Sequence, residues 1–218
     1  MKPSQKLTLF HKFLRPRRSS AGKPPALIML HGRGADEDDL LGLSEYFDDR
    51  LFIVSARAPF SFSLGGGYTW YDLEEIGKPD RTMFLESYGK LRTFLVEARE
   101  QYDFDPARTF CCGFSMGSSM AFAIALTRTD LLAGVIANSG FVPEDSGMEF
   151  RWEGVKGKPF FIAHGIYDPV IPYAYSRRAK EILENHGAKV TYREYDMGHQ
   201  INEESLNDMI AWLAPRLD

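Results

Sequence analysis

One segment of the chain has the residue types and the spacing of a nucleophile site. Residues 113–117 read Gly-Phe-Ser-Met-Gly and match the pattern G-x-S-x-G. They follow an apolar segment at 109–112 and precede a run of small residues, and a nucleophile elbow needs this strand–turn–helix setting. Glycines on both sides carry no side chains that would collide in so tight a turn. We therefore predict that Ser115 is a nucleophile rather than part of an ordinary tight turn.

A serine hydroxyl is a weak nucleophile and needs a base, with a carboxylate that orients the base. After such an elbow the acid and then the histidine follow along the chain. His199 lies after the last expected strand and before the last expected helix, so we predict that it is the base. Asp168 follows an expected strand between the other two and is the predicted acid. Asp196 is its rival, although it lies very close to His199 in the chain.

Attack on a carbonyl would place negative charge on the substrate oxygen, and two preorganised backbone N–H groups would stabilise it. Met116, directly after the nucleophile, is expected to supply one donor. The other is expected from the His-Gly-Arg-Gly segment at 31–34, where we choose the N–H of Arg33. The side chain of Arg33 would either attract an anionic group or pair with nearby acids, and the sequence leaves both open.

Short apolar segments alternate with longer helical patterns, which predicts right-handed βαβ units and a mostly parallel, doubly wound sheet with helices on both faces. The expected strands are 7–14, 26–30, 51–55, 108–112, 132–137, 159–163 and 189–195, and the expected helices are 36–48, 81–101, 115–128, 173–187 and 202–214. The acids at 36–39 could suggest a metal cluster, but Asp36 as a helix cap accounts for them. In such a sheet ligands bind beyond the carboxyl ends of the strands, where the candidate residues fall.

The composition is that of a soluble globular protein, and we expect one domain over residues 1–218. Hydrophobic residues make up 44% of the chain and charged residues 26%. No apolar run is long enough for a membrane span or a secretory signal. The two cysteines, Cys111 and Cys112, are neighbours that would point to opposite faces of a strand, so we expect no disulfide and a reducing, cytoplasmic location.

Residues 1–23 contain basic residues and no acid, whereas the whole chain has a net charge of −4. Such an arm could contact anionic lipid or nucleic acid. We favour a solvated edge strand and loop instead. The basic residues are Lys2, Lys6, Lys12, Arg15, Arg17, Arg18 and Lys23.

The motifs together resemble the phospholipase/carboxylesterase family of α/β-hydrolases, which includes acyl-protein thioesterases and bacterial carboxylesterases. The matching pieces are residues 30–34, Asp39 with Leu40, residues 70–72, residues 113–117, residues 164–165 with Asp168 and Pro172, and residues 197–199. The resemblance implies the triad Ser115, Asp168 and His199, backbone donors at Arg33 and Met116, and Trp70 near an acyl pocket. The chain departs from the thioesterase pattern at Met116, where glutamine is frequent, and at the glycines 65–67.

Residues 138–163 must contain a further strand, so they leave too little chain for a large cap domain, and we expect an open site shaped by loops. The aromatic residues of segment 60–80 either form an apolar acyl pocket or cover the edge of the sheet. They are Phe60, Phe62, Tyr68, Trp70 and Tyr71.

The expected function is hydrolysis of carboxylic esters, with thioesters and lysophospholipids as further candidate substrates. We expect no cofactor or metal, no nucleic-acid partner, and a monomer or homodimer. Two alternatives stay open: a non-catalytic ligand-binding protein on the same fold, and a metal-dependent hydrolase that uses His31, His164 and His199 at the sheet edge.

Overall fold

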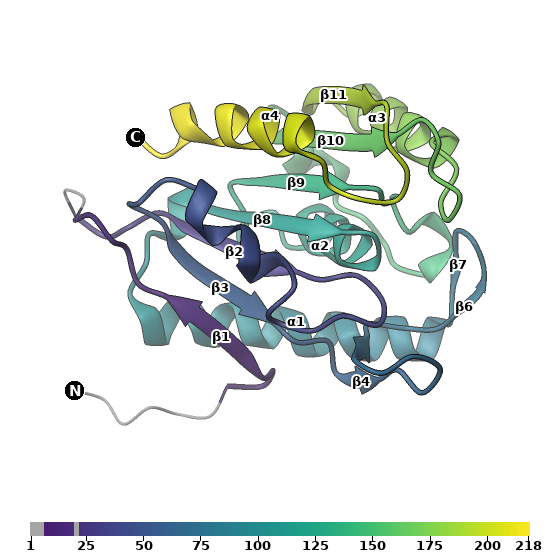
Figure 1. Ribbon diagram of the computed structural model, residues 1–218, viewed down its shortest axis with the longest axis horizontal. Helices are drawn as coiled ribbons and strands as arrows, with labels where there is room; N and C mark the ends of the chain where they lie inside the picture. Colours follow the sequence, from purple (N-terminus) through teal and green to yellow (C-terminus); the bar gives the residue numbers. More distant parts are fainter. Residues whose placement is uncertain (1–6, 20–21) are drawn as a thin grey trace.

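A seven-stranded sheet forms the centre of the molecule in the computed structural model, which describes residues 7–19 and 22–218 (Figure 1). The strand order is β1-β3-β2-β8-β9-β10-β11. β1 runs antiparallel to β3, and all the other neighbouring strands are parallel, so the predicted mostly parallel sheet is confirmed. The strands are β1 (His11–Leu14), β2 (Ala26–Leu30), β3 (Phe52–Ala56), β8 (Thr109–Phe114), β9 (Gly134–Asn138), β10 (Pro159–Gly165) and β11 (Lys189–Tyr195).

Helices cover both faces of this sheet. α1 (Arg81–Tyr102), α2 (Met116–Thr127) and α3 (Ala174–Asn185) pack on one face, whereas α4 (Glu203–Leu213) and the 3₁₀ helix η1 (Leu40–Tyr46) pack on the other. In Figure 1 α4 lies in front of the sheet and α1 and α2 lie behind it. This is the doubly wound arrangement expected from the alternation of strands and helices. Among the described residues, no helix combines the length and the hydropathy needed to cross a bilayer.

The central strands read as unbroken apolar runs because both of their faces are buried. Alternate side chains of β2 enter the two cores, and all five of its residues are buried. Cys111 and Cys112 of β8 likewise enter opposite cores and are free thiols. Burial raises the pKa of the Cys112 thiol to about 12, so this side chain is not a thiolate near neutral pH.

The connections at the carboxyl edge of the sheet are short. Two small hairpins, β4 (Phe60–Ser61) with β5 (Tyr68–Thr69) and β6 (Leu73–Glu75) with β7 (Lys78–Pro79), follow β3. Between β9 and β10 there are only the 3₁₀ turns η3 (Glu144–Ser146) and η4 (Trp152–Val155). Within the described part of the chain there is therefore no large cap domain, as expected.

The helix predicted at 36–48 is wrong in type and in its start. The structure has only the 3₁₀ helix η1 at 40–46, and its N-cap is Asp39, without a side-chain cap bond. Glu37 is buried and forms an ion pair with Arg57 at 2.5 Å, which fixes the segment before η1 as a turn. Asp36 caps that turn, since its Oδ1 accepts a hydrogen bond from the Asp38 N–H at 2.9 Å.

The expected strand at 7–14 is shorter in the structure. Pairing with β3 begins only at His11, which lies opposite Ala56. Leu7 and Leu9 are nevertheless buried in the core. Leu7 and Leu9 are thus buried in irregular chain while Phe10 stays exposed, and a pattern of apolar residues does not distinguish this from a strand.

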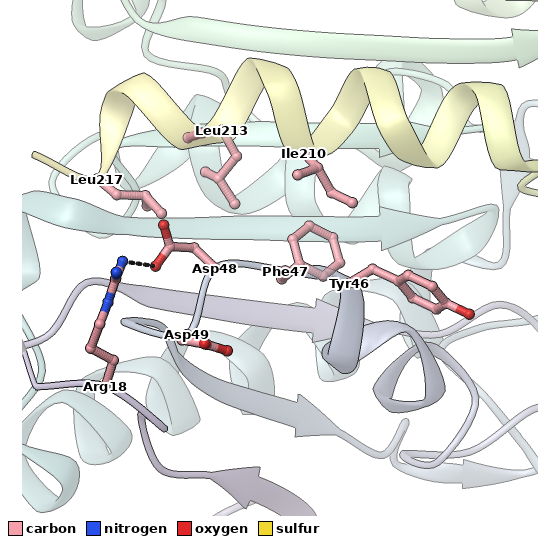
Figure 2. Close-up of a pocket in the computed structure, with 9 residues that line it drawn as sticks. Arg18, Tyr46, Phe47, Asp48, Asp49, Ile210, Leu213 and Leu217 are labelled. Carbon is pink, nitrogen blue, oxygen red and sulfur yellow. Dashed lines mark ion pairs between the residues drawn. The ribbon is translucent and has the colours of Figure 1, made fainter.

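Charges of the basic arm pair with acids on the body of the protein. Lys2 and Lys6 lie outside the described residues. The described pairs are Lys12 with Asp38, Arg17 with Asp49, Arg18 with Asp48, and Lys23 with Asp103, at 2.5, 2.6, 3.6 and 2.6 Å. Figure 2 shows the Arg18–Asp48 pair beside a shallow hollow that Phe47, Ile210, Leu213 and Leu217 line. These contacts tie the arm to the domain as an edge strand and loop.

Candidate active site

Ser115 lies in a strained turn between β8 and α2. Its backbone has φ 54° and ψ −117°, a conformation that residues other than glycine rarely adopt. Strain of this kind costs about 1–3 kcal/mol and is common at functional sites. The residue is the N-cap of α2, where the helix dipole favours negative charge, and it lines a cavity at the carboxyl edge of the sheet.

The glycines on either side of Ser115 are required by close packing rather than by an unusual φ. A Cβ on Gly117 would lie 2.0 Å from the Leu30 carbonyl oxygen, and a Cβ on Gly113 would lie 2.4 Å from the Ser118 nitrogen. Neither distance is possible without movement of the backbone. These glycines let α2 begin directly against β2 and so place Ser115 at the sheet edge.

Replacing Gly117 with alanine is expected to destabilise the protein by about 3 kcal/mol or more, because the clash is with backbone atoms that cannot move aside alone. For a domain of this size that loss lowers Tm by about 6–12 °C, as measured by thermal or urea unfolding. Gly89 in α1 gives the matched control, since a Cβ there meets nothing within 4 Å. Gly89→Ala is expected to stabilise the protein by about 0.5–1 kcal/mol, and equal effects at both positions would contradict the packing argument.

Asn138, at the end of β9, forms hydrogen bonds that hold the turn at 113–117 in place. Its carbonyl oxygen accepts hydrogen bonds from the Ser115 N–H and the Ser118 Oγ–H, both at 2.8 Å. Its Nδ2 donates to the Gly113 carbonyl oxygen at 3.1 Å. Asn138 is not among the residues predicted from the sequence. A signal for it was present, since it is a polar residue at the carboxyl end of a predicted strand.

His199 and Asp168 are joined as the sequence predicts. The His199 Nδ1–H donates to Asp168 Oδ2 at 2.7 Å, while Asp168 Oδ1 accepts from the N–H groups of Val170 and Ile171, both at 2.8 Å. Burial alone would raise the pKa of the Asp168 carboxyl, but these three hydrogen bonds outweigh it and hold that pKa below its usual range. The carboxylate therefore stays charged beside the imidazole. Asp196, the rival acid, is exposed.

Ser115 and His199 line the same cavity. Among the described residues, no hydrogen bond joins Ser115 Oγ to His199, and contacts of this kind commonly tighten only when substrate is bound. Because His199 Nδ1 carries its proton toward Asp168, the other ring nitrogen is left to accept one. The Phe114 ring packs against the His199 ring with centroids 4.9 Å apart, which limits the rotation of the imidazole.

A second histidine contacts the same carboxylate. His164 Nε2 lies 2.8 Å from the Ile171 carbonyl oxygen and 3.2 Å from Asp168 Oδ2, and its side chain is fully buried. Burial lowers the pKa of His164, so its ring is neutral near neutral pH. His164 and His199 thus contact the same oxygen of Asp168, a contact of His164 that cannot be predicted from the sequence because it depends on how the loop after β10 folds.

The segment at 31–34 lies opposite the elbow. The Ala58 N–H donates to His31 Nε2 at 3.0 Å, so His31 Nδ1 carries the proton and donates to the Gly32 carbonyl oxygen at 2.7 Å. Within residues 7–19 and 22–218, neither the Arg33 N–H nor the Met116 N–H donates to a protein acceptor. Both residues line the cavity, so two backbone donors are available to a ligand there.

Trp70 lies away from the cavity, contrary to the expectation that it borders an acyl pocket. It is fully buried, and its Nε1–H donates to the His31 carbonyl oxygen at 2.9 Å. The indole thus supports the segment at 31–34 from inside the core. None of the aromatic residues at 60–71 lines the cavity, and Trp70 and Tyr71 are fully buried in the core.

The cavity has a volume of about 640 Å³ and mostly apolar walls. That size is typical of small-molecule sites, which combine apolar walls with a few convergent polar groups. Apolar side chains come from the β6–β7 hairpin, the elbow and the loops after β9 and β10, namely Leu73, Ile76, Phe114, Met116, Phe141, Val170 and Ile171. The charged or titratable residues on its wall are Arg33, Asp39, Glu75 and His199.

The histidines considered for a metal site serve other contacts. His31 bonds the backbone of Gly32 and Ala58, and His164 bonds Ile171. Across the ranges that the structure describes, no three or more His, Cys, Asp or Glu side chains are grouped so that they could hold a metal ion.

Comparison with known proteins finds relatives along nearly the whole chain. A family model described as Phospholipase/Carboxylesterase matches residues 18–216. Acyl-protein thioesterase 1 of Candida albicans is 28% identical, and the match covers 91% of this chain and 94% of the relative. The carboxylesterase structure from Bacillus cereus has a TM-score of 0.84 at 29% identity, covering 95% of this chain and 94% of that one. The structure of esterase PE8 has a TM-score of 0.83 at 27% identity, covering 96% and 99%.

Proposed function

The chain belongs to the phospholipase/carboxylesterase family, and we propose that it hydrolyses carboxylic esters through an acyl-enzyme on Ser115. It is an enzyme, a serine hydrolase of the carboxylesterase and thioesterase type. The observation that carries the specific mechanism is the placement of Ser115 in a strained turn on the same cavity as His199, whose ring is bonded to Asp168.

In the first half of the reaction His199 accepts the proton of Ser115 Oγ as that oxygen attacks the ester carbonyl. The N–H groups of Arg33 and Met116 donate to the resulting oxyanion, and each such donor contributes about 2.7–4 kcal/mol to the stability of the transition state. The His199 imidazolium then protonates the leaving alcohol or thiol. The carbonyl bond to the leaving group breaks, and the acyl group stays on Ser115.

Water completes the cycle by the same steps in reverse order. His199 takes a proton from water, the hydroxide attacks the acyl carbonyl, and the oxyanion again meets the two N–H donors. His199 then returns the proton to Ser115 Oγ, and the carboxylic acid leaves. Asp168 keeps its charge throughout and stabilises the imidazolium, consistent with the lowered pKa of its carboxyl.

The proposed substrates are esters and thioesters with short to medium acyl groups. The apolar side chains on the cavity wall would bury such a group at a gain of about 25 cal/mol per Å². The absence of a large cap in the described residues leaves this cavity open to small-molecule substrates of varied shape. A thioester follows the same path because the departing thiolate also takes its proton from His199.

The proposal predicts covalent labelling of one serine by a fluorophosphonate probe. We expect one probe per chain, located by peptide mass spectrometry on residues 113–117 at Ser115, with hydrolysis of p-nitrophenyl butyrate lost in proportion to labelling. Ser118 and Ser119 on α2 are internal controls, since both are fully buried. Label on another serine, or full labelling with unchanged hydrolysis, would contradict the assignment.

The same assay separates the two alternatives. A non-catalytic binding protein would neither label nor hydrolyse the ester while remaining folded. Metal-dependent hydrolysis would be abolished by a chelator and restored by added metal, whereas the acyl-enzyme mechanism on Ser115 predicts the same rate before and after chelation.

A further inference from the structure

Arg33 is one of the residues that line the reaction cavity, and its side chain is exposed at the mouth of that site rather than packed in the core. Among the described residues its side chain forms no ion pair and no hydrogen bond with the protein. Its one recorded contact is with the Phe62 ring, whose centroid lies 5.7 Å from Arg33 Cζ. The sequence leaves two roles open for this side chain, which are pairing with nearby acids and attraction of an anionic group. The described residues show no pairing with an acid.

Two acids near Arg33 in the sequence form ion pairs with other cations. Glu37 pairs with Arg57, and Asp38 pairs with Lys12. Glu75, which also lines the cavity, pairs with Lys78 across the β6–β7 turn. Each of these acidic charges is thus offset by a cation other than Arg33.

Asp39 is the other acid that lines the cavity, and among the described residues no ion pair joins it to Arg33. Its carboxyl has a pKa above the usual value, mainly because of burial, and Arg33 is not among the groups that perturb it. The cavity lining therefore includes a cation and an acid that are not paired with each other. An anion that enters would be attracted at Arg33 and repelled at Asp39.

We propose that the Arg33 guanidinium binds an anionic group, a carboxylate or a phosphate, carried by the acyl part of the ester substrate. This inference rests on the proposed function, because the N–H of the same residue would hold the oxyanion, which keeps the guanidinium within one side-chain length of the reacting carbonyl. The planar fork of arginine matches both anions in a two-point contact. The chain as a whole has a net charge of −4, so a preference for an anionic substrate requires a local cation such as this one.

The test compares substrates that differ only in charge. The wild-type enzyme is given the p-nitrophenyl monoester of adipic acid and the corresponding monoamide, in which a neutral carboxamide replaces the carboxylate. A second pair carries a terminal phosphate or a terminal hydroxyl on a hexanoyl chain. The readout is the ratio of kcat/KM for the charged over the neutral member of each pair, so a general change in activity cancels.

We expect a ratio of about 10 or more for one of the two pairs, since hydrogen bonds to a charged partner are worth about a factor of ten or more in binding. Arg33→Met is expected to reduce that ratio about tenfold, and Arg33→Lys should keep part of it. Asp39→Asn is the matched opposite, because removal of a like charge should raise the ratio about twofold. Added NaCl should lower the ratio in the wild type.

The pair that shows the preference identifies the anion as carboxylate or phosphate. A wild-type ratio near or below one for both pairs, or a ratio that Arg33→Met leaves unchanged, overturns the inference while hydrolysis of the neutral esters upholds the proposed function. If neither neutral nor charged esters are hydrolysed and Ser115 takes no fluorophosphonate, both fall together.

Discussion

Replacing Ser115 with alanine is expected to lower kcat for p-nitrophenyl butyrate by about 10⁵-fold or more. Loss of the nucleophile in a serine hydrolase costs about 10⁶-fold in kcat, and what remains comes from the oxyanion donors and substrate binding. The strained backbone of Ser115 and its place on the cavity are typical of a nucleophile. Steady-state rates with fluorophosphonate titration of the wild type, to count active sites, give the measurement.

This variant should fold as well as the wild type. Within the described residues Ser115 Oγ makes no hydrogen bond to the protein, and alanine keeps the same backbone restrictions as serine, so little stability depends on the hydroxyl. Ser119→Ala supplies the matched control one turn along α2, because Ser119 Oγ is buried and has no hydrogen-bond partner among the described residues. It should retain activity and labelling. A folded Ser115→Ala protein with more than about 1% of the wild-type rate would contradict the mechanism.

Most of the sheet can be predicted from local sequence because its strands are buried on both faces. The run of residues 26–30 is apolar without interruption, and the structure has a strand over the same residues. η1 could not be predicted in this way. The segment before it is held by the ion pair between Glu37 and Arg57, which are twenty residues apart, and a helical pattern in residues 36–48 carries no sign of that contact.

The candidate site shows the same division. The order of Ser115, Asp168 and His199 along the chain indicates which residues the topology brings to one edge, and the bond between Asp168 and His199 agrees with it. Trp70 shows the limit, because an aromatic residue near the site in sequence can face the core as readily as the cavity. The supporting contact of His164 depends on the loop after β10, which brings Ile171 to its ring only in the fold, whereas Asn138 acts through the pairing of β9 with β8.

Asp168→Asn is expected to lower kcat by about 10⁴-fold while KM changes little, because the amide would fix His199 in the wrong tautomer. Oδ1 of Asp168 receives the N–H groups of Val170 and Ile171, so the asparagine oxygen must take that position. Its NH₂ group then faces His199 Nδ1 and donates to it. The proton of His199 moves to the other ring nitrogen, which can no longer accept the Ser115 proton.

Asp196→Asn is the matched control, since it makes the same chemical change in the rival acid. Asp196 is exposed, and we expect the variant to keep its rate within about twofold of wild type, because exposed substitutions away from a site have small effects. Asparagine at 168 also places an NH₂ group next to His164 Nε2, which lies 3.2 Å from Asp168 Oδ2. Urea unfolding should therefore show a free energy of unfolding lower by about 1–3 kcal/mol for the variant at 168 and not for the one at 196. If the variant at 196 were the inactive one, the acid of the triad would have to be reassigned to the loop that carries His199. If both variants stayed active, His199 would not depend on a carboxylate. Only its place on the same cavity as Ser115 would then support its role as the base.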